Sequence, residues 1–280
     1  MRGKIFKLLR SNVTRWVVKF VPQKKGLVFL TLHHLDKSEF EWLCQVLDYL
    51  QGFCDFLDPK EIEHPEYTLR ESSRTQIILT FDDGFRCHKK IVDQCLDSRN
   101  IKAIFFIPTA FVGLTGEKAF EFTKRNFFPN SSPKKLEKDS YDAMNWDDLD
   151  SLVKSGHIIG AHTRSHPMLS RIFETQLNSE ISEAADFLEE KLNIKVSHFA
   201  YPFGSIESVD ALAFAEAKKR FAWAYSNIRG MGKDSPCRHF IYRQNIVPKS
   251  PIWLVEAIVK GRLDFRYKNV RFRASKKIFG

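Results

Sequence analysis

Short apolar runs alternate with helical patterns along most of this chain, and this alternation restricts its fold more than any other feature. Apolar residues recur at helical spacing between the runs, as at Leu177, Ile181 and Ala185. Strands that alternate with helices build parallel sheets from βα units. We therefore expect an α/β fold, a distorted (β/α) barrel of about seven strands, with strands over residues 27–32, 77–81, 102–107, 157–161, 196–200, 221–226 and 240–246.

Length and composition favour one large domain. At 280 residues with 43% apolar content, the chain can bury the core of a single barrel, and no repeat or low-complexity tract is visible. We expect a basic amphipathic segment over residues 1–26, the barrel domain over 27–265 and a basic tail over 266–280. Residues 111–142 show no clear period, so they form either an excursion that shapes a substrate groove on the barrel face or a plain surface insertion.

The net charge of +10 is concentrated at the two ends of the chain. Residues 1–25 carry eight Lys or Arg and no acid, and residues 266–280 carry six and no acid. The body between them has 30 basic and 34 acidic residues, which gives a net charge of about −4 by the same count. An acidic body argues against nucleic acid as the main partner, and a terminal charge run is more often solvated than bound to phosphate.

The N-terminal segment interleaves basic and apolar side chains. It lacks the uninterrupted apolar stretch of a signal peptide and is too charged for a membrane span. An amphipathic helix on an anionic membrane face and a solvated or self-packed terminal helix both fit this pattern. The hypothesis that follows is a cytoplasmic protein with peripheral contact at the inner face of the membrane through its basic ends.

The cysteine pattern points to free thiols. The five cysteines are odd in number and show no CxxC spacing, namely Cys44, Cys54, Cys87, Cys95 and Cys237. This pattern indicates neither a disulfide framework nor a cysteine zinc site. Buried thiols in a reducing compartment are the simpler interpretation.

Two adjacent carboxylates stand at the end of a predicted strand. Asp82 and Asp83 directly follow the apolar run over residues 77–81 and precede Gly84. Adjacent acids repel each other, so a fold keeps them at a strand end mainly where a cation, hydrogen bonds or water offset the repulsion. A metal site is one explanation. A simple turn is the other, because Asp-Asp-Gly is a common turn sequence.

Two histidines are the candidate partners for such a metal. His162 and His166 follow the apolar run that ends at Ala161, and Pro167 prevents them from continuing as a helix. Two imidazole nitrogens and one carboxylate oxygen are the usual protein ligands of a catalytic zinc ion. Two histidines four residues apart also occur by chance. Both motifs follow strands, however, and the carboxyl ends of barrel strands meet at one face, which makes the metal site the better explanation.

Three motifs, in order, resemble the polysaccharide deacetylase family, also called the NodB homology group or carbohydrate esterase family 4. They are residues 80–84 (TFDDG), 162–167 (HTRSHP) and 199–204 (FAYPFG), and residues 145–157 are similar to the helix before the family's histidine motif. The resemblance covers roughly residues 28–265 and identifies the chain as a divergent member. It implies a metal-dependent carbohydrate deacetylase on a (β/α) barrel.

The resemblance also implies roles for the first two motifs. Asp83, His162 and His166 would hold one divalent metal ion, with Zn²⁺ the expected ion. Asp82 would act as the general base that takes a proton from the attacking water. A divalent ion lowers the pKa of water and polarises an acyl carbonyl, which suits hydrolysis of an N-acetyl group.

The third motif would contact the substrate. By resemblance, Tyr201, Pro202 and Phe203 line the site, and the backbone N–H of Phe203 stabilises the oxyanion. Many members carry an arginine in this motif that orients the base, and here that position is Ala200. Arg243 is the candidate replacement from a neighbouring strand, with an ordinary surface arginine as the alternative.

The acid that protonates the departing amine has no obvious source. The family's late Leu-x-His motif is absent, since no histidine follows His239. His34 is the preferred substitute, because its position resembles the Tyr-His that opens a subgroup of these enzymes. We expect His33 to point to the opposite face and to be structural. His239 and His88 are weaker candidates.

The sequence therefore predicts a metal-dependent hydrolase that removes an N-acetyl or related acyl group from an amino sugar. The sugar would belong to a saccharide, a glycolipid or an envelope polysaccharide precursor. The alternative is a non-catalytic carbohydrate-binding protein on the same fold, which Ala200 and the missing late histidine make credible. Asp82 favours catalysis, because a binding protein has no need of an unliganded carboxylate beside a metal.

Overall fold

The computed structural model describes residues 18, 20–64, 67, 73–129 and 138–280. Its strands form one parallel sheet with the order β7-β6-β5-β4-β3-β1-β8. The predicted α/β fold with about seven strands is confirmed. The strands of this path are β1 Gly26–Leu32, β3 Thr75–Phe81, β4 Ala103–Ile107, β5 Ile158–Ala161, β6 His198–Ala200, β7 Trp223–Tyr225 and β8 Gln244–Asn245.

One further strand was not predicted. β2, Cys54–Phe56, pairs in parallel with the first residues of β3, beside the part of β3 that β4 does not reach. Its sequence, Cys-Asp-Phe, is too short to show any periodicity.

The curved sheet is joined into a distorted barrel by the segment that leads into β8. The backbone N–H of Ile241 donates to Ala224, next to the bridge between Ile241 and Tyr225 of β7. A few residues later, Gln244 pairs with Leu30 of β1. Residues 241–245 therefore contact both edges of the sheet, and Arg243 stands between the two contacts.

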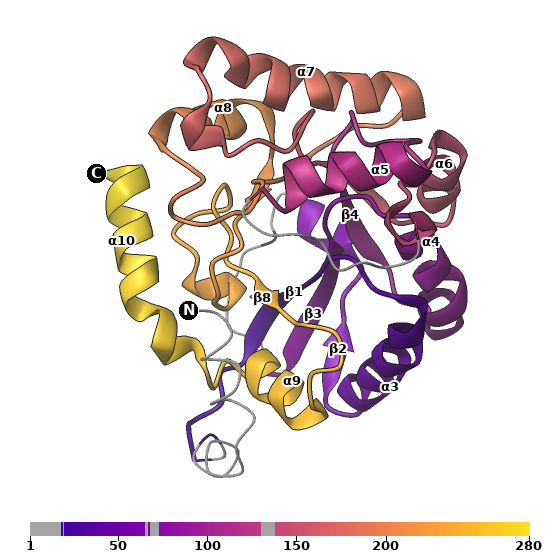
Figure 1. Ribbon diagram of the computed structural model, residues 1–280. Helices are drawn as coiled ribbons and strands as arrows, with labels where there is room; N and C mark the ends of the chain where they lie inside the picture. Colours follow the sequence, from indigo (N-terminus) through magenta and orange to yellow (C-terminus); the bar gives the residue numbers. More distant parts are fainter. Residues whose placement is uncertain (1–17, 19, 65–66, 68–72, 130–137) are drawn as a thin grey trace.

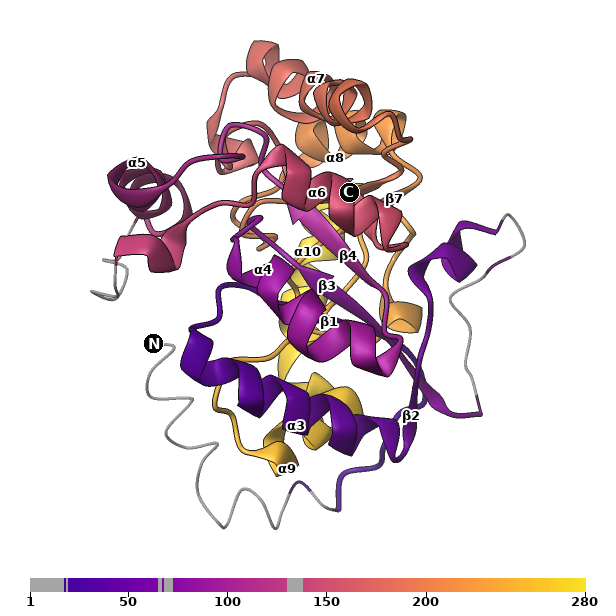
Figure 2. The same ribbon diagram turned by 90° about the vertical axis from the view of Figure 1, so that its right-hand side faces the viewer.

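Helices cover the outside of the sheet. In Figure 1, α7 and α8 lie at the top of the molecule and α3 and α9 at the bottom, and each pair is in contact. Figure 2 shows α5 at the margin of the barrel, within the predicted excursion over residues 111–142. The helices are α3 Phe40–Gln51, α4 Cys87–Ile91, α5 Gly116–Phe122, α6 Trp146–Lys154, α7 Glu174–Leu192, α8 Ala211–Arg220, α9 Ile252–Val259 and α10 Lys268–Phe279.

Apolar side chains fill both sides of the strands. In β1, Val28 and Leu30 pack outward with the helices, whereas Leu27 and Phe29 belong to a smaller cluster inside the barrel. Every residue of β1 is buried. Strands buried on both faces read as continuous apolar runs, so the sequence predicts the strand but not which residues face inward.

The C-terminal residues form a helix that packs on the barrel. Ala274 and Ile278 of α10 are buried, and the ring of Phe279 lies 4.9 Å from that of Phe214 in α8. The proposed N-terminal amphipathic helix falls almost entirely outside the described residues. The division at residues 26 and 265 and the contact with a membrane stay predictions. Among the residues that the structure describes, no helix is both long and apolar enough to cross a membrane.

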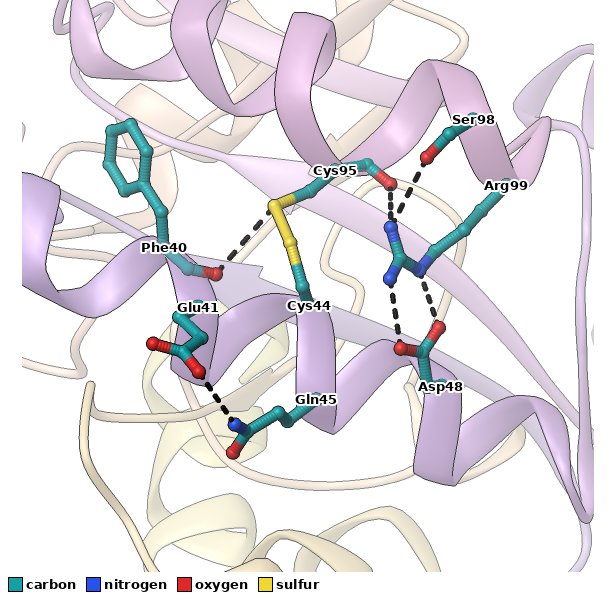
Figure 3. The surroundings of a disulfide bond; sticks show 8 residues. All are labelled: Phe40, Glu41, Cys44, Gln45, Asp48, Cys95, Ser98 and Arg99. Atoms are coloured by element: carbon teal, nitrogen blue, oxygen red, sulfur yellow. Dashed lines mark hydrogen bonds and ion pairs between the residues drawn. A yellow bond between two sulfur atoms is a disulfide. The ribbon is translucent and has the colours of Figure 1, made fainter.

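The prediction of free thiols is wrong for two of the cysteines. Cys44 in α3 and Cys95 in the π-helical turn Val92–Leu96 form a disulfide, with 5.5 Å between their Cα atoms (Figure 3). Beside it, Arg99 donates to both carboxylate oxygens of Asp48, at 2.6 and 2.8 Å. Spacing along the sequence could not reveal the pair, because the cysteines lie 51 positions apart and only the packing of α3 brings them together.

Candidate active site

The two carboxylates lie where β3 ends. The backbone N–H of Asp82 donates to Leu32 at 3.0 Å and so extends the ladder between β3 and β1 by one residue. Ile78 and Thr80 face the barrel interior, and alternation along the strand directs Asp82 to the same side. Asp82 is only 2% exposed. The next residue, Asp83, has a left-handed backbone that turns its side chain toward the histidine loop.

Arg243 makes a two-pronged ion pair with Asp82. Its Nη1 donates to Oδ1 at 2.8 Å and its Nη2 donates to Oδ2 at 2.7 Å. A third donor, Nε, reaches the carbonyl oxygen of Ser226 at 2.7 Å, and the side chain is completely buried. A guanidinium held in this way is an orienting group for the carboxylate, because its planar donors fix both oxygens.

The ion pair also controls the ionisation of Asp82. Burial alone would raise the pKa of this carboxyl, but the Arg243 guanidinium outweighs it and holds the pKa well below its usual range. Asp82 is therefore a carboxylate at neutral pH. It can accept a proton, although each of its oxygens already accepts one hydrogen bond from Arg243.

Asp83, His162 and His166 form a buried cluster. The Nε2 atoms of His162 and His166 lie 3.5 and 3.4 Å from Oδ1 of Asp83. One potential ligand atom from each residue lies within 4.8 Å of the others. This donor set, two imidazole nitrogens and a carboxylate oxygen, suits a divalent ion such as Zn²⁺.

The contacts of Nδ1 in each imidazole ring support binding of a metal through Nε2. Nδ1 of His162 lies 2.7 Å from the carbonyl oxygen of Ala200, and Nδ1 of His166 lies 3.1 Å from that of Asn126. A carbonyl oxygen can only accept, so both rings carry their proton on Nδ1 and present the Nε2 lone pair to Asp83. Burial lowers the pKa of His166 to about 4, which keeps that ring neutral and able to bind a metal.

The backbone at the cluster is strained. Four residues have φ angles in the left-handed region, which residues other than glycine rarely adopt. They are Asp83 (78°), Thr163 (65°), His166 (63°) and Phe203 (59°). The hydroxyl of Thr163 accepts the N–H of His166 at 2.9 Å and helps to hold this turn. Strained residues of this kind persist only where the surrounding structure fixes them.

The loop after β6 places only part of the predicted motif at the site. The ring of Phe203 packs against His166, with 4.7 Å between the ring centroids. Within the described part of the chain, its backbone N–H donates no hydrogen bond. Gly204 allows the turn, because a Cβ there would come within 2.3 Å of the backbone nitrogen of Asn227. Tyr201 instead lies in the outer core, where its hydroxyl donates to His239, so the structure does not bring its side chain to the cluster.

The structure reverses the predicted orientations of the two histidines after β1. His34 lies between the rings of Phe85 and Tyr141, and its Nε2 is 2.6 Å from the carbonyl oxygen of Ser140. His33 is the residue that reaches the site, with its Nε2 3.7 Å from Oδ2 of Asp82 and its side chain 36% exposed. The expectation that His34 faces the site and His33 does not is therefore wrong. Thr31 lines the interior, and the residue two positions on shares its face.

The weaker acid candidates lie elsewhere. His88 is completely buried, with its Nε2 3.1 Å from the carbonyl oxygen of His33. The backbone oxygen of His239 accepts the Tyr201 hydroxyl in the outer core. The excursion over residues 111–142 does contribute to the site, because Asn126 supports His166 and the Phe127 ring lies 4.8 Å from its imidazole.

A pocket of about 250 Å³ opens beside this cluster. His166 and Phe203 form its inner side, and Met168 and Ile172 add apolar surface. A carboxylate paired with a buried arginine and an aspartate-histidine cluster that suits a divalent ion thus lie at one end of a parallel barrel, next to a pocket.

Comparison with known proteins identifies the family. The sequence profile of the polysaccharide deacetylases matches residues 70–221, more than half of this chain. The chain therefore belongs to the polysaccharide deacetylase family. A peptidoglycan-N-acetylglucosamine deacetylase of Bacillus cereus is 28% identical over 136 residues, which are 48% of this chain and 38% of that protein. The chain spans less than half the length of the curated relatives it matches.

Solved structures agree on the fold. IcaB from Ammonifex degensii superimposes with a TM-score of 0.66 at 22% identity, covering 85% of this chain and 98% of IcaB. The Streptococcus pyogenes deacetylase PplD, determined in complex with acetate, has a TM-score of 0.63 at 17% identity and covers 85% of this chain and 99% of PplD. At these identities the likeness shows the fold, a (β/α) barrel of the deacetylase type.

Proposed function

We propose that this protein is a metal-dependent deacetylase that removes an N-acetyl group from an amino sugar of a saccharide, a glycolipid or an envelope polysaccharide precursor. The observation that carries the proposal is the division of work between the two adjacent carboxylates. Asp83 faces His162 and His166, whereas Asp82 pairs with Arg243 and lies outside this cluster. A binding protein would need the first group but not the second.

In this proposal Asp83, His162 and His166 hold one divalent ion, with Zn²⁺ the best match to the donor set. When bound, the ion supplies Lewis acid chemistry that activates water and polarises the acyl carbonyl. Asp82 accepts a proton from the attacking water, and Arg243 keeps the carboxylate in one orientation. The N–H of Phe203 is free to donate to the developing oxyanion.

His33 is the group placed to protonate the departing amine. Its Nε2 lies 3.7 Å from Oδ2 of Asp82, the oxygen that also accepts a hydrogen bond from Arg243. In this proposal Arg243 orients the base, and His33 provides an exchangeable proton. Its partial exposure gives access to solvent, from which it can be reprotonated. Water thus loses a proton to Asp82 as its oxygen bonds to the acyl carbon. The amide C–N bond then breaks, the acyl group leaves as acetate, and the amine leaves with a proton from His33.

Removal of the metal tests the proposal. The purified protein is expected to contain about one divalent ion per chain and to release acetate from N-acetylglucosamine oligomers. Dialysis against a chelator should abolish acetate release, and added Zn²⁺ should restore it. Acetate release that survives complete removal of metal would contradict the proposal. Bound metal with no turnover on a broad panel of acetylated amino sugars would favour the carbohydrate-binding alternative.

The two neighbouring histidines provide a matched pair for testing the acid. His33→Gln is expected to lower kcat by roughly 100-fold with little change in KM or metal content, because the substitution removes a general acid. His34→Gln changes the next residue in the same way, yet its side chain contacts the Ser140 carbonyl rather than Asp82, so kcat should stay near the parent value. Equal losses in the two variants, or a larger loss in His34→Gln, would remove His33 from the mechanism.

A further inference from the structure

Two arginines flank the pocket beside the cluster. Arg125 belongs to the π-helical turn Thr123–Phe127, and Arg171 belongs to the short helix Leu169–Arg171 after the histidine loop. Both side chains are exposed. Across the described ranges, neither guanidinium forms an ion pair or a hydrogen bond. Lys124, the residue before Arg125, does pair with Glu121 at 3.7 Å.

Among the residues that the structure describes, no carboxylate lines the pocket. Two unpaired positive charges around a concave site raise the local potential when no carboxylate lines the site beside them. Arginine donates two parallel hydrogen bonds to phosphate or carboxylate groups, so this arrangement favours an anion over a neutral sugar hydroxyl. The body of the protein as a whole is slightly acidic, which makes this local excess of positive charge distinctive.

The pocket also shares residues with the candidate site. His166 and Phe203, which adjoin the candidate metal site, form part of the same wall. Asn126, the residue after Arg125, holds the His166 ring through its carbonyl oxygen. An anion bound by the arginines would therefore lie close to the amide under attack. At about 250 Å³ the pocket is small by comparison with pockets for drug-sized ligands, and it suits one sugar unit or one charged group.

We propose that the substrate carries an anionic group, a phosphate ester or a carboxylate, on or next to the acetylated sugar, and that Arg125 and Arg171 bind it. This inference rests on the proposed function and narrows its substrate class to charged amino sugars. Neutral N-acetylglucosamine polymers lack the group that the pocket recognises, so they are poorer substrates.

Direct binding tests the inference independently of turnover. The metal-loaded protein is titrated by calorimetry with N-acetylglucosamine 1-phosphate, N-acetylmuramic acid and N-acetylglucosamine. The parent is expected to bind at least one of the two anionic sugars at least tenfold more tightly than the neutral one, and added salt should reduce this preference. Preference for the phosphate indicates a phosphate ester substrate, and preference for the muramic acid indicates a carboxylate.

Variants locate the binding group. Arg125→Gln/Arg171→Gln is expected to weaken binding of the preferred anionic sugar at least tenfold and to lower its kcat/KM by a similar factor, mainly through KM. Lys124→Gln removes a neighbouring positive charge that is paired with Glu121 and does not line the pocket, so it should leave binding unchanged. Equal binding of all three sugars by the parent, or a double variant that binds like the parent, would overturn the inference. Absence of turnover on every sugar would count against the proposed function alone, since the binding titration would still report on the arginines.

Discussion

Asp82→Asn is expected to lower kcat for acetate release by roughly 10²- to 10⁴-fold, because the substitution removes the group that accepts the proton of water. The amide keeps the shape of the side chain and still accepts one hydrogen bond from Arg243. Metal content should stay at the parent level, since Asp82 pairs with the guanidinium and is not part of the ligand cluster. Steady-state kinetics of acetate release would measure kcat, and elemental analysis would measure the metal content.

Two control variants distinguish loss of the general base from loss of the metal and from loss of any carboxylate. Asp83→Asn is expected to lose metal as well as activity, because Asp83 belongs to the ligand cluster. Asp93→Asn neutralises an exposed carboxylate paired with Lys89 and should change neither. Asp82→Asn with more than about a tenth of the parent kcat would exclude Asp82 as the base.

A buried guanidinium without its anionic partner is destabilising, so folding of Asp82→Asn needs a check. Circular dichroism and a urea titration provide it. If the single variant does not fold, Asp82→Asn/Arg243→Met removes both charges together and should restore stability. That double variant is expected to be folded, metal-loaded and inactive. Activity in the folded double variant would contradict the role of Asp82 as directly as activity in the single one.

Loss of the Cys44–Cys95 disulfide is expected to lower the free energy of unfolding by about 4 kcal/mol, from the entropy that a closed loop of this length removes from the unfolded chain. Cys44→Ala/Cys95→Ala should show this loss in urea denaturation without reductant. The parent in reductant should show the same loss. The ion pair between Arg99 and Asp48 crosses the same two segments but is exposed, so it cannot replace the covalent bond.

Thiol counting provides the control. The unfolded parent should react with a thiol reagent at three cysteines without reductant and at five with it, because Cys54, Cys87 and Cys237 are free. Reductant should have no further effect on the stability of the double alanine variant. Cys237→Ala removes a free thiol and should keep the full effect of reductant. Five reactive thiols in the unreduced parent would disprove the bond.

The fold could be predicted because its strands are apolar runs separated by clear helical patterns. Each of the runs became a strand of the sheet, within a few residues at the ends. The structure also brings together the motif residues Asp82, Asp83, His162 and His166, as convergence of strand ends requires. Their catalytic roles stay proposals.

Two features were beyond the reach of the sequence, and a third, the contact of Arg243 with Asp82, could be inferred only indirectly. The disulfide depends on how α3 packs, which spacing does not encode. The choice between His33 and His34 depends on which face of β1 is interior, and both faces are equally apolar. Arg243 could be suspected only from the absence of an arginine at Ala200. Its side chain fills the barrel interior because residues 241–245 close the barrel, a property of the whole topology.

The residues with left-handed backbone conformations at the cluster matter for any attempt to raise the thermostability of this protein. Asp83, Thr163, His166 and Phe203 hold conformations that glycine would adopt without strain. Substitution by glycine would relax the backbone at each position but would delete a candidate ligand, a turn-holding hydroxyl or the wall of the pocket. Selection for thermostability and selection for turnover would therefore favour opposite residues at the same four positions, and a library screened for heat resistance alone would drift toward inactive proteins.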